Sequence, residues 1–194
     1  MEYVLRTKSL TKKFGSKIAV NAVDMNVAKG DIYGFIGRNG AGKTTAMKLI
    51  LGLLNATEGE IELFGGEPLE KARGRIGSLI EAPGIYKNCT AYENMKRFSI
   101  IYGGTDEDIA QLLKFVGLEN TGNKKAGRFS LGMKQRLGMA IAMLGNPEFL
   151  ILDEPINGLD PEGIKDVRNA VLNLNEQKGV TFLISSHLLD ELAK

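Results

Sequence analysis

The chain has 194 residues, the length of one domain or of one domain with a small insert. Its 25 basic and 23 acidic residues leave a net charge of +2, which excludes an acidic disordered chain and a basic nucleic-acid-binding arm. Its one cysteine, Cys89, excludes an internal disulfide partner, and no apolar run has the ~18 residues that a membrane-spanning helix needs.

Short runs of β-type residues alternate with helix-type patterns along the chain, which predicts an α/β fold with a mostly parallel sheet. The run at residues 149–152 is apolar on both faces, as expected for a strand in the centre of such a sheet. The runs at residues 3–6 and 18–27 hold more polar residues, so we assign them to an antiparallel β subdomain. The other predicted strands are residues 32–36, 60–64, 76–80 and 180–184.

A segment without predicted strands interrupts this pattern in the middle of the chain. Thr90 and Thr105 each begin a capping-box pattern, so they predict the starts of two helices. The second of these helices is expected to end at Gly117. We therefore expect an inserted helical subdomain at residues 84–127, within an α/β core made of residues 1–83 and 128–194.

A glycine-rich loop follows the predicted strand at residues 32–36 and matches the pattern G-x-x-x-x-G-K-[ST] without departure. Its glycines let the backbone aim N–H groups at phosphate oxygens, and the helix that follows adds the positive end of its dipole. We expect Lys43 to reach the β- and γ-phosphates and the Thr44 hydroxyl to bind Mg²⁺. A plain turn between strand and helix is the weaker interpretation, because the strand, the loop, the Lys-Thr pair and the helix all fit a phosphate-binding loop. The predicted nucleotide-binding residues are Gly37, Asn39, Gly40, Ala41, Gly42, Lys43, Thr44 and Thr45.

Two adjacent carboxylates, Asp153 and Glu154, follow the apolar run at residues 149–152. The carboxyl ends of parallel strands are where α/β sheets bind ligands, so we expect Asp153 to hold Mg²⁺ and Glu154 to polarise an attacking water. The alternative is a helix start with acidic residues, for which Pro155 is well suited. A GTPase is disfavoured because the guanine-reading pattern N-K-x-D is absent from the sequence.

The order of these motifs resembles that of the ATP-binding cassette (ABC) ATPases. After the loop and the helical insert come Ser130-Leu-Gly-Met-Lys-Gln-Arg, the two carboxylates, Asn157-Gly-Leu-Asp and Ser185-Ser-His. The resemblance covers nearly the whole chain. It implies the P-loop NTPase fold of the ABC ATPases, the cofactors ATP and Mg²⁺, and ATP hydrolysis coupled to membrane transport, with Glu154, His187 and Lys43 as catalytic residues.

The resemblance also gives roles to residues that face a second cassette. Ser130 and Gly132 lie in the stretch that matches the family signature, which contacts ATP bound to the partner, although Leu131 replaces the first glycine of that signature. Helix capping would also explain Ser130. Asp160 before Pro161 has the same two interpretations, a helix cap and a residue at the contact between cassettes.

Two further positions match ligand contacts of the family. His187 matches the histidine that senses the γ-phosphate, whereas a single histidine without that resemblance is more often structural. Phe14 stands where an aromatic ring stacks on adenine, and a core-filling phenylalanine is the competing interpretation.

Glu81 stands where family members generally carry a glutamine that touches Mg²⁺ and couples to the membrane subunit. A carboxylate is also a good Mg²⁺ ligand, so the predicted metal ligands are Thr44, Asp153 and Glu81. The stretch from Ile76 to Tyr86 is similar to cassettes of bacitracin-type peptide-antibiotic exporters and lantibiotic self-protection transporters.

The resemblance implies an ATPase subunit that works as a dimer, with a homodimer expected, and binds separate transmembrane subunits at the cytoplasmic face of the membrane. We expect no nucleic-acid partner. The alternatives are a soluble ABC-type ATPase acting on DNA and a P-loop small-molecule kinase. Residues 188–193 predict a helix, and because family cassettes usually continue further, we interpret the chain as truncated at its C-terminus.

Overall fold

The computed structural model describes residues 2–187, and its strands and helices follow the predicted order closely. The strands are β1 (Tyr3–Phe14), β2 (Lys17–Ala28), β3 (Ile32–Ile36), β4 (Glu58–Leu63), β5 (Ile76–Leu79), β6 (Phe149–Asp153) and β7 (Thr181–Ser186). The helices are α1 (Lys43–Ile50), α2 (Leu69–Arg73), α3 (Ala91–Tyr102), α4 (Asp106–Phe115), α5 (Leu131–Ala142) and α6 (Pro161–Lys178), with short 3-10 turns at Glu119–Thr121 and Ala126–Arg128. The predicted helix at residues 188–193 lies outside the described residues.

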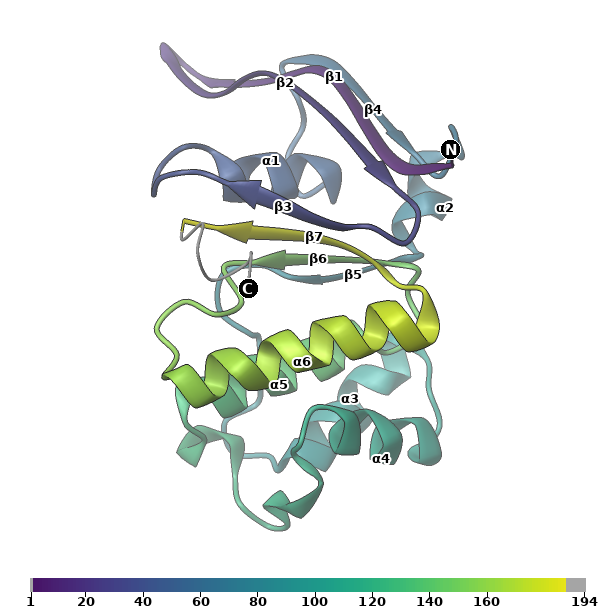
Figure 1. The fold of residues 1–194 in the computed structure, drawn as a ribbon, viewed down its shortest axis with the longest axis vertical. Helices are drawn as coiled ribbons and strands as arrows, with labels where there is room; N and C mark the ends of the chain where they lie inside the picture. The colour runs from purple at the N-terminus through teal and green to yellow at the C-terminus, as the bar shows by residue number, and fades with distance from the viewer. Residues whose placement is uncertain (1, 188–194) are drawn as a thin grey trace.

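A parallel sheet in the order β3-β7-β6-β5 forms the centre of the molecule, and its four strands point the same way in Figure 1. Along this sheet Asp153 pairs with Ser185, and Ile36 pairs with Ser186. The carboxyl ends of β3, β7 and β6 therefore meet at one edge. β6 is buried along its whole length, which confirms the prediction of a central strand.

A second, antiparallel sheet has the order β2-β1-β4 and confirms the predicted antiparallel β subdomain. One expectation was wrong in detail. The first strand does not stop at residue 6 but continues to Phe14, with bulges in its pairing and a positive φ of 49° at Ser9. The strand near residue 60 joins this antiparallel sheet. Pairing with β2 on one side and β4 on the other stabilises the polar second half of β1 as a strand. The local pattern of apolar residues does not contain this information.

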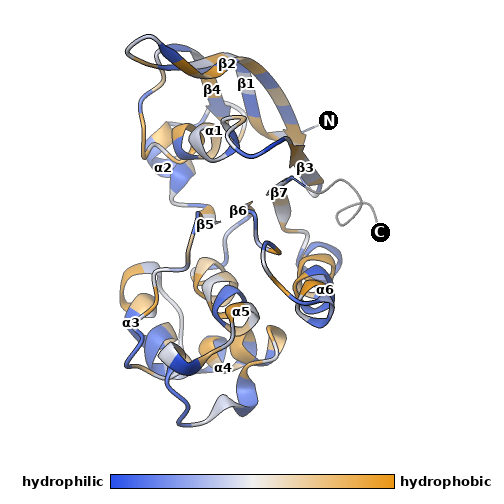
Figure 2. Cartoon of the chain, turned by 90° about the vertical axis from the view of Figure 1, so that its left-hand side faces the viewer, coloured by the Kyte–Doolittle hydropathy of each residue, from blue (hydrophilic) through white to orange (hydrophobic). Residues whose placement is uncertain are grey.

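Helices cover both faces of the parallel sheet. Figures 1 and 2 show α1 between this sheet and the antiparallel sheet, and α5 and α6 on the opposite face. Buried side chains of α1, β1 and β2 form one core with Phe149 and Ile151 of β6. The other core contains Leu150 and Leu152, so alternate residues of β6 serve both faces.

The segment between β5 and α5 is helical, as predicted, and both capping boxes are present. Thr90 and Thr105 each accept a hydrogen bond from the backbone N–H three residues on. The carboxylates of Glu93 and Asp108 in turn accept one from the backbone N–H of Thr90 and of Thr105. The apolar faces of α3 and α4 share one continuous core with α5, α6 and the sheet. The predicted boundaries at residues 84 and 127 stay a prediction.

Within residues 2–187 the helices are all too short or too polar to cross a lipid bilayer.

Candidate functional site

The glycine-rich loop leaves the carboxyl end of β3 and enters α1 at Lys43. Gly42 is the N-cap of α1 with a φ of 92°, a conformation that side chains rarely allow. A Cβ at Gly42 would also lie 2.1 Å from the carbonyl oxygen of Ala19 on β2. Glycine is therefore required here both by the backbone angle and by the close approach of β2. The geometry leaves the N-terminus of α1 free to face a phosphate.

Lys43 folds back over the loop and is almost fully buried. Its ammonium group donates hydrogen bonds to the carbonyl oxygens of Gly37 at 2.6 Å and Arg38 at 3.3 Å. The same group lies 3.0 Å from Oε1 of Glu154. The structure thus brings the predicted phosphate-binding lysine and the predicted catalytic carboxylate into direct contact.

Thr44 and Asp153 meet across the edge of the sheet. The Thr44 hydroxyl donates to Oδ2 of Asp153 at 2.7 Å, although the two residues are 109 positions apart. Asp153 is buried at the end of β6. Hydroxyl and carboxylate oxygens are the ligands that Mg²⁺ prefers, so the chemistry of this pair fits the predicted metal site.

Glu154 follows β6 in a left-handed backbone conformation, with a φ of 50°. The alternative interpretation of Asp153 and Glu154 as a helix start is wrong, because a turn follows them and the next helix begins only at Pro161. The Glu154 carboxylate lies between Lys43 and His187, and His187 Nδ1 is 2.5 Å from Oε2. Burial alone would raise the pKa of the Glu154 carboxyl, but the hydrogen bonds from Lys43 and His187 hold its pKa below the usual value.

The predicted site residues Ser130, Gly132 and Glu81 lie outside this cluster. The Ser130 hydroxyl accepts a hydrogen bond from the N–H of Met133 at 3.2 Å, so it caps α5, and Gly132 lies in the first turn of that helix. Glu81 follows β5, and its exposed carboxylate accepts a hydrogen bond from Lys48 Nζ at 2.6 Å. The predicted roles of these residues toward ATP and Mg²⁺ stay predictions.

Phe14 ends β1 with 50% of its surface exposed, so the interpretation of a core-filling side chain is wrong. The ammonium group of Lys12 lies 5.1 Å from the centre of the Phe14 ring. Asp160 caps α6 by accepting a hydrogen bond from the N–H of Gly163, with Pro161 in the first turn, as its capping interpretation predicts.

Sequence reasoning missed the contribution of Ser185, whose hydroxyl contacts both carboxylate residues of the site. The signal was available in the motif Ser185-Ser-His, because it directly follows the predicted strand at residues 180–184. It also missed Lys48 as the partner of Glu81.

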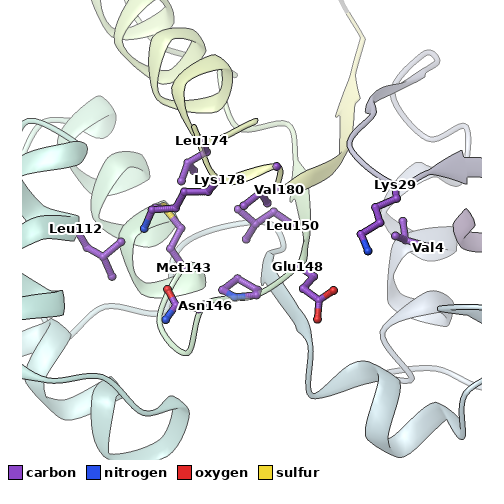
Figure 3. A pocket seen from close by; sticks show the side chains of 12 residues that line it. Val4, Lys29, Leu112, Met143, Asn146, Glu148, Leu150, Leu174, Lys178 and Val180 are labelled. Atoms are coloured by element: carbon purple, nitrogen blue, oxygen red, sulfur yellow. The ribbon is translucent and has the colours of Figure 1, made fainter. Parts of the chain in front are cut away.

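A cavity of about 350 Å³ lies at the other end of the strands. Figure 3 shows its lining, in which the charged side chains of Lys29, Glu148 and Lys178 stand among apolar ones. Glu148 precedes β6 and Lys178 ends α6, so the cavity is at the amino ends of β6 and β7. None of the residues predicted to bind nucleotide lines it.

Comparisons with known proteins agree with the geometry at the carboxyl edge. The family model for the ABC transporter matches residues 20–157. The chain is 47% identical over 196 residues to the bacitracin transport ATP-binding protein BcrA of Enterococcus faecalis, covering 99% of this chain and 64% of that protein. It is 45% identical over 189 residues to the lantibiotic transport ATP-binding protein SrtF of Streptococcus pyogenes, covering 97% of this chain and 82% of that protein.

A solved structure also has this fold. The dimeric, post-hydrolysis structure of the ATP-binding cassette MJ0796 bound to ADP and Pi matches with a TM-score of 0.83 at 27% identity, covering 97% of this chain and 90% of that one. The chain spans less than two thirds of the length of BcrA. The relatives are transport proteins, so they favour neither the DNA-acting ATPase nor the small-molecule kinase.

The family match over residues 20–157, the identity to transport ATP-binding proteins and the cassette fold lead to one conclusion: the chain belongs to the ABC transporter family of ATP-binding proteins.

Proposed function

We propose that the chain is the ATP-binding and ATP-hydrolysing part of an ABC transporter and powers the export of a peptide antibiotic or a similar compound. The observation that carries this proposal is the convergence of Lys43, Thr44, Asp153, Glu154 and His187 at one edge of the parallel sheet. They are the residue types that phosphate binding, metal binding and the activation of water require.

The chain's own residues divide the chemistry among them. Lys43 and the N–H groups at the start of α1 bind the β- and γ-phosphates. Thr44 and Asp153 hold Mg²⁺, which neutralises the developing charge on the phosphate oxygens when it is bound.

Glu154 orients and deprotonates the attacking water, and His187 contacts the γ-phosphate. Lys43 contacts the Glu154 carboxylate at 3.0 Å. A γ-phosphate competes with Glu154 for the same ammonium group, so nucleotide binding releases this carboxylate for its role as a base.

The site is completed by a second cassette, with a homodimer as the simplest arrangement. Ser130 and Gly132 lie at the start of α5, outside the cluster around Lys43, and the neighbouring Leu131 is half-exposed. A helix N-terminus with a free surface can bind a phosphate held by another molecule. The dimeric structure of MJ0796 with ADP and Pi supports this arrangement.

The helical segment provides the docking surface for a transmembrane subunit, which holds the chain at the cytoplasmic face of the membrane. A groove on α3 is lined by Tyr92, Arg97 and Ile100, and Ile100 is 82% exposed. Exposed apolar side chains rimmed by charge are typical of protein contacts. The relatives BcrA and SrtF are named for the transport of bacitracin and of a lantibiotic, which supports a peptide-antibiotic substrate.

Two variants test this function. Lys43→Ala should abolish ATP binding, because it removes the main cationic contact to the phosphates. Glu154→Gln should retain binding and slow ATP hydrolysis by ~10²–10⁴, the usual contribution of a positioned base. Calorimetric titration with ATP and a phosphate-release assay measure the two effects. Wild-type ATP affinity in Lys43→Ala, or unchanged turnover in Glu154→Gln, would contradict the proposal.

A further inference from the structure

Ser185 lies at the carboxyl end of β7, directly beside Asp153 in the register of the parallel sheet. Its side chain is fully buried. The hydroxyl donates a hydrogen bond to Oδ1 of Asp153 at 2.6 Å and accepts one from the backbone N–H of Glu154 at 2.8 Å. One buried hydroxyl thus contacts both Asp153, the last residue of β6, and Glu154, which follows it.

The first contact orients the Asp153 carboxylate. Ser185 occupies Oδ1, and the Thr44 hydroxyl donates to Oδ2, so the two oxygens have different partners on two different elements. Asp153 is buried, and a buried carboxylate that loses a donor is destabilised and free to rotate. Ser185 therefore fixes which oxygen of Asp153 faces Thr44.

The second contact holds the backbone of Glu154. This residue has a φ of 50°, and left-handed backbone is unfavourable for a residue with a Cβ. The Ser185 hydroxyl pairs with the N–H at this bend, which helps to keep the chain turned there. The same bend lets the Glu154 carboxylate contact Lys43 and His187.

We propose that Ser185 is a positioning residue that couples the metal site to the catalytic carboxylate: it orients Asp153 toward Thr44 and holds the bend that places Glu154. The proposal rests on the function proposed above. Outer-shell partners of metal ligands are typically worth 10–100-fold in metal affinity or activity. Ser185→Ala should therefore raise the Mg²⁺ concentration for half-maximal ATP binding by about 10–100-fold and lower turnover.

Thr181 offers a matched control on the same strand. It is also fully buried, and its hydroxyl accepts a hydrogen bond from the backbone N–H of Gly30 at 2.9 Å. It lies at the amino end of β7, away from the carboxylates. Thr181→Val also removes a buried hydroxyl and its hydrogen bond. It therefore measures the effect of lost stability alone, because Thr181 does not contact the site.

The experiment compares wild type, Ser185→Ala and Thr181→Val in calorimetric titrations of ATP at several Mg²⁺ concentrations and in EDTA. We expect only Ser185→Ala to shift the Mg²⁺ dependence, with ATP affinity in EDTA close to that of wild type. Equal Mg²⁺ dependence in all three proteins would overturn the proposal, as would the same shift in both variants.

A nucleotide-free measurement separates this inference from the proposed function. In urea unfolding, the combined variant Ser185→Ala with Asp153→Ala should lose less stability than the sum of the single variants, because both remove the same contact. Strict additivity would overturn the role of Ser185 whether or not the chain hydrolyses ATP. If wild type binds ATP but does not hydrolyse it, the proposed function is contradicted. The measured coupling between Ser185 and Asp153 would still show whether Ser185 positions Asp153.

Discussion

The Glu154 carboxylate is the centre of the contacts at the carboxyl edge of the sheet. Lys43 and His187 both face the Glu154 carboxylate, and two loop carbonyl oxygens accept hydrogen bonds from Lys43. A buried ammonium group needs such partners, since desolvation without them is unfavourable. Lys43 and Glu154, the proposed phosphate-binding and catalytic groups, are thus paired with each other. An anionic ligand that binds Lys43 competes with this contact.

The lowered pKa of Glu154 predicts how stability depends on pH at the residue scale. Its ionised form is favoured in the folded chain, so this stabilisation is present above the usual pKa of 4.5 and is lost as the pH falls through the lower folded value. Wild type should therefore lose more stability than Glu154→Gln between about pH 7 and about pH 3. Urea unfolding at both pH values measures the difference. The same loss in both proteins would contradict the role of the Glu154 network.

At the scale of single elements, β3, the glycine-rich loop that ends at Gly42, and α1 form the proposed phosphate-binding unit. This unit depends on its contact with β2, because the Ala19 carbonyl reaches the space that a side chain at Gly42 would fill. The antiparallel sheet thus helps to shape the loop, although it supplies none of the loop's residues.

Gly42→Ala and Gly40→Ala separate backbone strain from this close contact. Both glycines have positive φ, at 92° and 81°, but a Cβ at Gly40 meets nothing within 4 Å. Gly40→Ala should lose about 1–2 kcal/mol of stability from strain alone, and Gly42→Ala on the order of 3–4 kcal/mol. Urea unfolding of the two variants gives the comparison. Equal losses would show that the Ala19 contact is unimportant.

At the scale of the whole molecule, the nucleotide site and the signature helix α5 belong to different parts of the surface. Lys43 follows β3, whereas Ser130 caps α5 on the other side of the parallel sheet (Figure 1). Under the function proposed above, a second cassette supplies the signature that meets a phosphate bound by Lys43. This separation is the physical reason for expecting a dimer.

The Glu154→Gln variant should form dimers when ATP and Mg²⁺ are both present, because slow hydrolysis keeps the shared nucleotide in place. Size-exclusion chromatography with light scattering measures the mass. The same variant with EDTA, and a second variant that also carries Lys43→Ala, should stay monomeric. Monomers of Glu154→Gln under every condition would contradict the shared site.

Patterns within a few neighbouring residues were predicted correctly from the sequence. The capping boxes at Thr90 and Thr105 and the caps at Ser130 and Asp160 are in the structure because each joins atoms only three residues apart. Contacts between distant segments were harder to predict. The pairing of Glu81 with Lys48 joins two elements 33 residues apart, and no local pattern contains that information.

The sequence by itself determined the family, the glycine-rich loop between strand and helix, and the central strand at residues 149–152, since these depend on local spacing and residue type. Only the tertiary structure decided the length of β1, the sheet to which β4 belongs, and the contacts of Ser185 and His187 with residues over 30 positions away. The physical reason is that strand order and register bring these side chains together. Strand order and register are set by packing and hydrogen bonds across the whole fold, and a local stretch of sequence does not specify these contacts.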